Sequence, residues 1–185
     1  MDRSLTNQST DLSHADPALT ERIMAGHYAI LAQVEYFRAN FGTAESRWKK
    51  DGTRVTIVDE TISRELFILL EKDFPSDDYC SEEEAETPEP IPTEAEFCWI
   101  LDPVDGTNNY AVGVPECCIS LGLLRHGIPV YGFIYDYGRD NLLQGGKEFG
   151  SIEGTTPVFA ATELVNEKLT YCMHFPIPCL LYTSP

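Results

Sequence analysis

Apolar residues recur at helical spacing in two stretches of the first half of the chain. The first stretch begins after Asp16-Pro17, a common start signal for a helix. Its apolar positions are Leu19, Ile23, Ile30, Val34, Phe37 and Phe41. The second stretch follows Asp59 and stops at Phe74-Pro75. Its apolar positions are Ile62, Leu66, Leu69 and Leu70. The pattern predicts two long helices, each burying one face in a core.

The second half of the chain changes to short apolar runs separated by turn residues. The runs cover residues 97–101, 117–124, 130–135 and 141–144. His126-Gly127 and Gly138-Arg139-Asp140 lie between them and favour tight turns between antiparallel strands. Two helices followed by a meander of strands predict an α+β fold. We expect a layered arrangement, with two long helices packed on a largely antiparallel sheet.

The net charge of the chain argues against some classes of binding partner. The chain has 13 Lys and Arg against 30 Asp and Glu, for a formal net charge of −17. Negative charge of this size opposes attraction to nucleic acids and to anionic membranes, so we expect neither as a partner. A phosphorylated small-molecule substrate needs local positive charge, which metal ions on a carboxylate cluster supply.

Cysteine usage and the first residues point to a compartment. None of the six cysteines forms a Cys-x-x-Cys pair, which argues against zinc. Cys98, Cys117 and Cys118 lie in apolar runs, where a thiol behaves as a small buried hydrophobe. Residues 1–14 lack the apolar segment of a signal peptide, and no run reaches membrane-spanning length. We therefore expect a reduced, cytoplasmic protein.

The hexapeptide at residues 102–107, DPVDGT, carries the strongest chemical signal. Its two aspartates stand three positions apart, and with the Val104 carbonyl they can supply oxygen ligands to a pair of Mg2+ ions. The amides of Gly106 and Thr107 can bind phosphate, especially where a helix begins near Asn108. An ordinary Asp-Pro turn that caps a helix explains the same residues, and the hexapeptide alone does not decide between the two readings.

Three further polar positions have structural explanations when taken singly. Asp59 falls in the first turn of the second predicted helix, where a carboxylate caps amide groups. Glu82 opens an acidic stretch interrupted by prolines, which is typical of a solvated loop. His27 lies beside the apolar stripe of the first helix, where a packed, hydrogen-bonded histidine is favoured over a ligand.

Several separate segments match one family in the same order. They are Asp51-Gly52-Thr53-x-Val55-Thr56-x-x-Asp59, Phe74-Pro75 with Ser81-Glu82-Glu83, Trp99 to Tyr110, and Gly127-x-Pro129-Val130-x-Gly132-x-Ile134-Tyr135-Asp136. With them the chain resembles the inositol monophosphatase-like family of Mg2+-dependent, lithium-sensitive sugar phosphatases over residues 16–176. The resemblance implies the N-terminal half of the family's αβαβα fold.

The resemblance also implies a metal site of two or three Mg2+ ions. Glu82, Asp102 and the Val104 carbonyl would hold the first ion, and Asp102 with Asp105 would hold a second. Glu82 thereby leaves the class of solvated acidic residues, whereas Glu83, Glu84 and Glu86 are expected to stay on the surface.

For catalysis, the resemblance implies that Asp59, Glu82 and Thr107 orient or activate the attacking water. Gly106, Thr107 and Asn108 would contact phosphate or substrate, although Asn108 serves equally well as a helix cap. A two-cation clamp can neutralise the phosphate oxygens, lower the pKa of water and stabilise the leaving alkoxide, so no covalent nucleophile is needed.

The function that the resemblance implies is hydrolysis of myo-inositol phosphate to inositol and phosphate, by a protein that is a homodimer when full length. Related phosphatases of fructose 1,6-bisphosphate, histidinol phosphate and 3'-phosphoadenosine 5'-phosphate are alternatives. A noncatalytic module that binds divalent cations is an alternative from another class.

The domain expectation also follows from the resemblance. We expect a disordered arm at residues 1–15, a metal- and phosphate-binding α+β domain at 16–176 and a non-native tail at 177–185. The family's C-terminal α/β domain, with an aspartate that completes the second metal site, is expected to be missing, because the last aspartate is Asp140. These 185 residues are therefore expected to show weak or no turnover.

Overall fold

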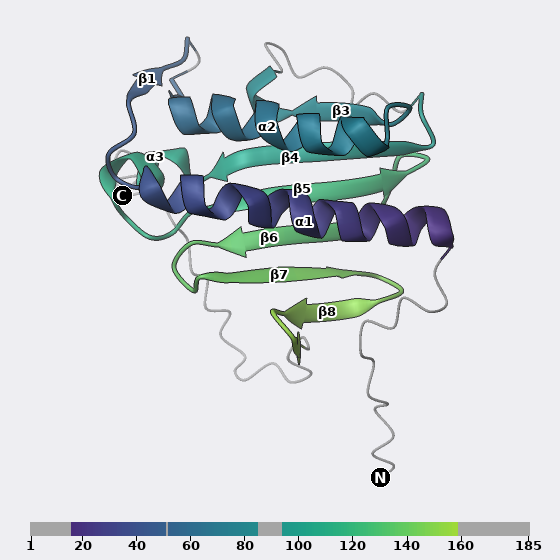
Figure 1. Ribbon diagram of the computed structural model, residues 1–185. Helices are drawn as coiled ribbons and strands as arrows, with labels where there is room; N and C mark the ends of the chain where they lie inside the picture. The colour runs from purple at the N-terminus through teal and green to yellow at the C-terminus, as the bar shows by residue number, and fades with distance from the viewer. Residues whose placement is uncertain (1–15, 51, 85–93, 159–185) are drawn as a thin grey trace, which may run out of the picture.

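Two long helices lie side by side on one face of a seven-stranded sheet (Figure 1). The structure is a computed structural model that describes residues 16–50, 52–84 and 94–158. The helices are α1 (Pro17–Ala39) and α2 (Ile57–Asp73). In spatial order the strands are β3 (Asp78–Ser81), β4 (Phe97–Asp105), β5 (Cys118–Arg125), β6 (Ile128–Asp136), β7 (Asn141–Gly146), β8 (Gly150–Glu153) and β9 (Thr156–Val158). The predicted layered α+β fold is confirmed.

Three smaller elements complete the described chain. A two-stranded hairpin pairs β1 (Ser46–Trp48) with β2 (Arg54–Thr56) ahead of α2. A single 3-10 turn, η2 (Glu82–Glu84), follows β3. A short helix, α3 (Thr107–Val112), follows β4 and lies at the same end of the sheet as the hairpin (Figure 1).

The two predicted helices form where the apolar stripes place them. The Asp16 side chain accepts a hydrogen bond from the Ala18 amide at 3.1 Å, which caps α1 ahead of Pro17. The apolar faces of both helices enter one core with the inward side of the sheet. Their buried members include Leu19, Ile23, Ile30, Phe37, Val58, Ile62, Leu66 and Leu70. Hydrophobic burial on this single interface is the main source of stability for the layers.

Pairing in the sheet is antiparallel everywhere except between β3 and β4, which run parallel. The four predicted apolar runs correspond to β4, β5, β6 and β7, whereas β3, β8 and β9 are absent from the prediction. The turn at His126-Gly127 has φ angles of 51° and 76°, and Asp140 has φ of 50°. Positive φ at these positions produces the tight connections that the turn residues predicted.

The hexapeptide at 102–107 is only partly a loop. β4 continues to Asp105, with a register shift against β5 between Asp102 and Asp105. Pro103 has no N–H to donate to the ladder, so pairing is interrupted there and resumes beyond it. The strand predicted from the apolar run at residues 97–101 is therefore longer than that run. The bulge holds the two aspartates on a strand end rather than on a free loop.

A buried ion pair ties α1 to the region after α2. The Arg22 guanidinium donates to both carboxylate oxygens of Asp77, at 2.8 and 2.7 Å. The indole N–H of Trp99 in β4 donates to the same carboxylate at 3.0 Å. This network joins both helical segments to the sheet at the end opposite the hairpin.

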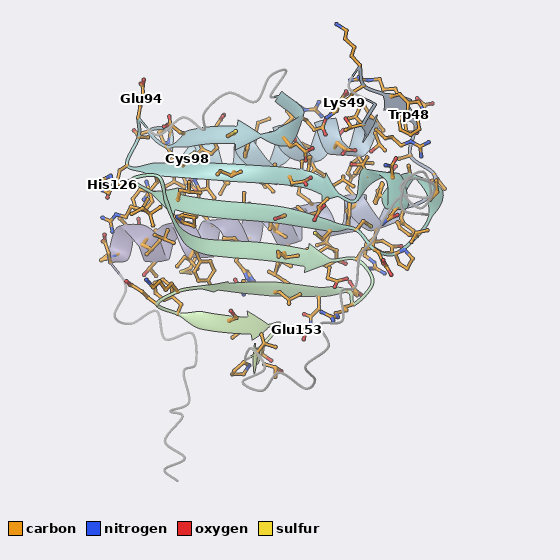
Figure 2. All side chains as sticks on the ribbon, turned by 180° about the vertical axis from the view of Figure 1, so that it is seen from behind. Trp48, Lys49, Glu94, Cys98, His126 and Glu153 are labelled. Atoms are coloured by element: carbon orange, nitrogen blue, oxygen red, sulfur yellow. The ribbon has the colours of Figure 1, made fainter. Side chains whose placement is uncertain are left out.

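The other face of the sheet carries no helix in the described residues, as the view from behind shows (Figure 2). In that part of the chain, no helix is both long enough and apolar enough to cross a membrane. The expected arm at 1–15 and tail at 177–185 lie outside the described residues, as do Glu86 and the last part of the expected domain.

Candidate active site

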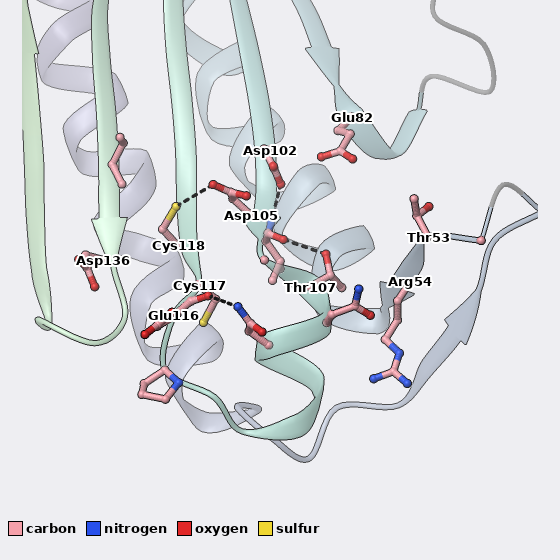
Figure 3. Close-up of a pocket in the computed structure, with 17 residues that line it drawn as sticks. Thr53, Arg54, Glu82, Asp102, Asp105, Thr107, Glu116, Cys117, Cys118 and Asp136 are labelled. Carbon is pink, nitrogen blue, oxygen red and sulfur yellow. Dashed lines mark hydrogen bonds between the residues drawn. The ribbon is translucent and has the colours of Figure 1, made fainter. Parts of the chain in front are cut away.

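A cleft of about 830 Å³ opens at the carboxyl end of β4, between the hairpin, α3 and the ends of β5 and β6 (Figure 3). Its lining residues are Gly52, Thr53, Arg54, Glu82, Asp102, Val104, Asp105, Gly106, Thr107, Asn108, Asn109, Pro115, Glu116, Cys117, Cys118, Ile134 and Asp136. Every residue that the sequence assigned to metal, phosphate or substrate binding lines this cleft. Asp59, the remaining candidate, lies directly behind Thr107.

Strand pairing places a row of polar side chains across the cleft floor. Asp105 in β4 pairs with Cys118 in β5, and Cys118 pairs with Asp136 in β6. Directly paired residues project on the same side of a sheet, so these three side chains share one face. Asp136 received no role from the sequence. The register of three strands, which a single sequence does not specify, is what brings it here.

The carboxylates of the cleft repel one another. Burial, and then the neighbouring Glu82 and Asp105 charges, raise the pKa of Asp102 to about 8, although an amide hydrogen bond from Val104 at 3.2 Å acts in the opposite direction. A cation between these groups would relieve this repulsion, and an all-oxygen donor set suits a hard divalent cation.

The carboxylates share the cleft without forming a closed ligand cage. Among the residues that the structure describes, no three His, Cys, Asp or Glu side chains stand close enough together to hold a metal ion. Glu82, on the 3-10 turn, and the two aspartates of β4 face the same space from different elements (Figure 3).

Thr107 and Asp59 form a polar pair at the start of α3. The Thr107 hydroxyl lies 3.2 Å from a carboxylate oxygen of Asp59 and 2.8 Å from the carbonyl of Val104. It has one hydrogen and can donate to only one of these acceptors at a time. When it donates to Asp59, the Val104 carbonyl is free to face a cation.

Asp59 serves the fold as well as the cleft. It is 1% exposed, and its carboxylate accepts hydrogen bonds from the Thr56 amide at 2.9 Å and the Thr56 hydroxyl at 2.5 Å. These contacts complete the capping box of α2, so the capping role predicted for Asp59 is confirmed. Burial raises its pKa to about 6, despite the hydrogen bonds from Thr56. One carboxylate thus caps a helix and holds the Thr107 hydroxyl.

The backbone conformation at position 106 requires a glycine. Its φ is 83°, and a Cβ at this position would lie 2.8 Å from the carbonyl oxygen of Glu116. A larger residue would force the strand end away from the loop that leads into β5. The glycine therefore fixes how closely the start of α3 approaches the rest of the cleft.

Two sequence expectations need correction. Cys118 is half-buried rather than enclosed, lines the cleft and donates to Asp105 at 3.6 Å; burial and that carboxylate raise the pKa of its thiol. Glu83 was expected on the surface, but its side chain is 9% exposed and pairs with the ammonium of Lys49 at 2.8 Å. The ion pair joins the hairpin to η2. A two-stranded hairpin as short as this one is marginally stable on its own, so the contact helps to hold it in place.

Tyr110 anchors α3 to the end of α1. Its side chain is fully buried, its ring stacks on Phe37 at 4.7 Å, and its hydroxyl donates to the Phe37 carbonyl at 2.6 Å. The last carbonyls of a helix lack intrahelical partners, so this hydroxyl caps α1 from within α3. The residues that begin α3 are thereby fixed to the helical layer.

We expect Tyr110→Phe to weaken Mg2+ and phosphate binding about threefold and to cost about 1 kcal/mol of stability through the lost hydrogen bond. Tyr79→Phe is the matched control, because the Tyr79 hydroxyl donates to the Phe74 carbonyl at the end of α2, at 2.9 Å. It should cost similar stability and leave binding unchanged. Equal binding by both variants, measured by titration calorimetry, would remove the positioning role of Tyr110.

Comparisons with known proteins agree with this geometry. The chain matches the inositol monophosphatase family over residues 16–174. Inositol monophosphatase 1 of Solanum lycopersicum is 35% identical over 117 residues, which cover 62% of this chain and 43% of that protein. The IMPase of Thermotoga maritima has the same fold, with a TM-score of 0.68 at 22% identity over 77% of this chain and 54% of that one.

A third relative was solved with ligands. An IMPase/NADP phosphatase complexed with Mg2+ and phosphate has a TM-score of 0.60 at 25% identity, covering 72% of this chain and 51% of that chain. The present chain spans less than half the length of the curated relatives it matches. Because the family match extends over most of its residues and the cleft is built from the motifs that the match includes, the chain belongs to the inositol monophosphatase family.

Proposed function

We propose that this protein is a Mg2+-dependent phosphate monoester hydrolase, with a myo-inositol phosphate as the first substrate to test. One observation carries the proposal: three carboxylates, Glu82, Asp102 and Asp105, share a cleft with the hydrogen-bonded pair of Thr107 and Asp59. The family relationship and the relative solved with Mg2+ and phosphate support it.

Glu82, Asp102, Asp105 and the Val104 carbonyl would hold two or three Mg2+ ions. Bound there, the ions would lower the pKa of the attacking water and neutralise charge on the phosphate and the leaving oxygen. The residues fit this task because their oxygen donors are hard ligands and their repulsion needs a cation to offset it. The amides of Gly106 and Thr107 would donate hydrogen bonds to the phosphate oxygens, with Asn108 beside them.

Thr107 and Asp59 would orient the water. A threonine hydroxyl is a weak base, but a hydroxyl that donates to an ionised carboxylate turns its lone pairs toward a second hydrogen-bond donor. With Asp59 ionised, the Thr107 oxygen can accept a hydrogen bond from water and hold it in line with the phosphorus. Glu82 would help to position the same water.

This pair also separates hydrolysis from simple cation binding. Capping of α2 uses one oxygen of the Asp59 carboxylate, and a noncatalytic cation-binding module gives no use to the contact of the other oxygen with the Thr107 hydroxyl on the cleft wall. Phosphatases of fructose 1,6-bisphosphate, histidinol phosphate and 3'-phosphoadenosine 5'-phosphate would use the same metal chemistry. They form the substrate panel for the assay.

We expect Mg2+-dependent release of phosphate from myo-inositol 1-phosphate, measured with protein in excess over substrate and abolished by EDTA. Asp59 has a pKa of about 6, so it is ionised above that pH and protonated below it. Release should therefore fall as the pH drops through about 6, by about tenfold per pH unit once Asp59 is mostly protonated.

Two variants control the pH experiment. Asp59→Asn should lower release at neutral pH about 100-fold and remove the inflection near pH 6, because the amide does not titrate. Asp140→Asn, an exposed aspartate bonded to the Tyr135 hydroxyl, should keep the wild-type profile. An inflection that persists unchanged in Asp59→Asn contradicts the role of Asp59. Because weak turnover is expected of these 185 residues, the hydrolase proposal is contradicted when no substrate in the panel gives release above an EDTA blank and none binds in Mg2+ by titration calorimetry.

A further inference from the structure

Most of the charged side chains that line the cleft are acidic. Its lining carboxylates are Glu82, Asp102, Asp105, Glu116 and Asp136. Arg54 supplies the one basic side chain among the lining residues in the described chain. The carboxylates of β4 would hold the proposed Mg2+ ions. Arg54 stands apart from them, on the hairpin (Figure 3).

The hairpin presents Arg54 in a defined orientation. Trp48 and Arg54 are directly paired across β1 and β2, and the guanidinium lies 4.6 Å from the centre of the indole ring. Stacking on an aromatic face fixes the plane of the guanidinium and leaves its N–H edges available to a ligand. Lys49, the residue after the end of β1, forms an ion pair with Glu83 that holds the hairpin in place.

Arg54 also has an unused donor. Its Nε–H is buried, yet it has no hydrogen-bond partner among the described residues. A buried donor without a partner carries a desolvation cost, and such groups in native proteins call for an explanation. That N–H is enclosed by protein atoms, so a phosphate in the cleft would reach the guanidinium through its terminal N–H groups, and its negative charge would offset the desolvation cost of the arginine. An arginine can bind a phosphate through two parallel hydrogen bonds.

We infer that Arg54 binds a second phosphate of the substrate, so that the cleft prefers sugar bisphosphates over sugar monophosphates. The inference rests on the proposed phosphatase function, in which the phosphate to be hydrolysed lies on the cations and on the amides that begin α3. β2 packs against α3. Arg54 therefore borders the cleft on the side away from Asp105 and Asp136, where another part of a bound substrate would lie.

The test compares two ligands and two variants of the 185-residue chain. Fructose 1,6-bisphosphate and fructose 1-phosphate share one skeleton and differ only in the second phosphate. Their affinities are measured by titration calorimetry in Mg2+. The wild type should bind the bisphosphate about tenfold more tightly, as expected for one added charge-assisted contact. Arg54→Met should reduce this ratio to about twofold or less and leave the monophosphate affinity unchanged.

Arg47→Met is the matched control. Arg47 lies on the same hairpin, but its guanidinium is exposed and pairs with Glu60 at 2.6 Å, away from the cleft. This variant should keep the wild-type ratio, and an equal loss in both variants would attribute the effect to general charge and overturn the inference.

The remaining outcomes are also decisive. If Arg54→Met weakens both ligands equally, Arg54 contacts the phosphate that they share, and the inference fails while the proposed function stands. If Arg54→Met changes nothing, or if the wild type does not prefer the bisphosphate, the inference likewise fails alone. If neither ligand binds the wild type in Mg2+, the inference fails, and the proposed function is then decided by the assays with the rest of the substrate panel.

Discussion

Asp102→Asn is expected to weaken Mg2+ binding about 100-fold and at the same time to make the metal-free protein more stable by about 1–3 kcal/mol. The two effects have opposite signs because the carboxylate is useful only with a cation present. Burial, Glu82 and Asp105 all disfavour its charge in the metal-free fold. A side chain with a purely structural role would give the reverse pattern, with lower stability and unchanged metal binding.

The pH dependence of metal-free stability adds an independent check. The pKa of Asp102 is about 8 in the folded chain, above its ordinary value of 3.8, so the folded state binds a proton that the unfolded state has lost. This group therefore makes metal-free stability fall as the pH rises from about 4 to about 8. Asp102→Asn should lack that contribution.

Both measurements use urea unfolding in EDTA and calorimetric titration with Mg2+. Glu35→Gln is the control, because it removes one carboxylate from the exposed side of α1 and changes the net charge equally. It should leave Mg2+ affinity and metal-free stability nearly unchanged. An Asp102→Asn variant that binds Mg2+ like the wild type would disprove the assignment of this aspartate.

Asp77→Ala is expected to lower the free energy of unfolding by about 3–5 kcal/mol, since it would leave the Arg22 charge buried without its partner. The side chains of Arg22 and Asp77 are 14% and 3% exposed. The guanidinium also lies between two rings, 4.5 Å from the centre of Phe74 and 4.0 Å from that of Phe97, so it cannot readily turn to solvent. The variant would leave the Trp99 indole N–H unpaired as well.

Glu96→Ala provides the comparison in the same urea experiment. Glu96 pairs with Arg125 at 2.6 Å, but the two side chains are 48% and 32% exposed. Exposed ion pairs contribute about 0–1 kcal/mol, so this variant should unfold almost like the wild type. If the two variants lose similar stability, the Arg22–Asp77 pair is not the link between helices and sheet that its geometry indicates.

The helical layer could be predicted from the sequence because its signals are local. Spaced apolar residues mark the buried sides of α1 and α2, and Asp16-Pro17 and Phe74-Pro75 mark two of their ends. The small strands gave no such signal. β3 reads Asp-Tyr-Cys-Ser, without apolar alternation, and it forms a strand because it pairs with the buried β4.

The residues of the candidate site also fall into two groups, those with a local sequence signal and those placed by pairing between distant segments. The hexapeptide predicted the side chains that line the carboxyl end of β4, because five of its six residues lie there within one short segment. Arg54, Cys118 and Asp136 reach the same cleft through the hairpin and through strand register. Register depends on pairing between distant segments, so the pattern of one chain does not reveal these neighbours.

Only one of the two roles of Asp59 could be predicted from a local sequence signal. Capping could be predicted from its position in the first turn of α2, and a role beside Thr107 could be predicted only from resemblance to a family. The structure joins the two, because the capping carboxylate keeps one oxygen for Thr56 and turns the other toward Thr107.

The central claim, that the carboxylates at the end of β4 hold the divalent cations of a phosphatase, is tested most directly by locating the metal. Crystals of the protein grown with Mn2+ in place of Mg2+ would give an anomalous difference map. We expect a peak bounded by the carboxylates of Glu82, Asp102 and Asp105, within about 2.0–2.4 Å of their oxygens. A map with Mn2+ bound only elsewhere, or with no peak in this cleft at saturating Mn2+, would contradict the claim.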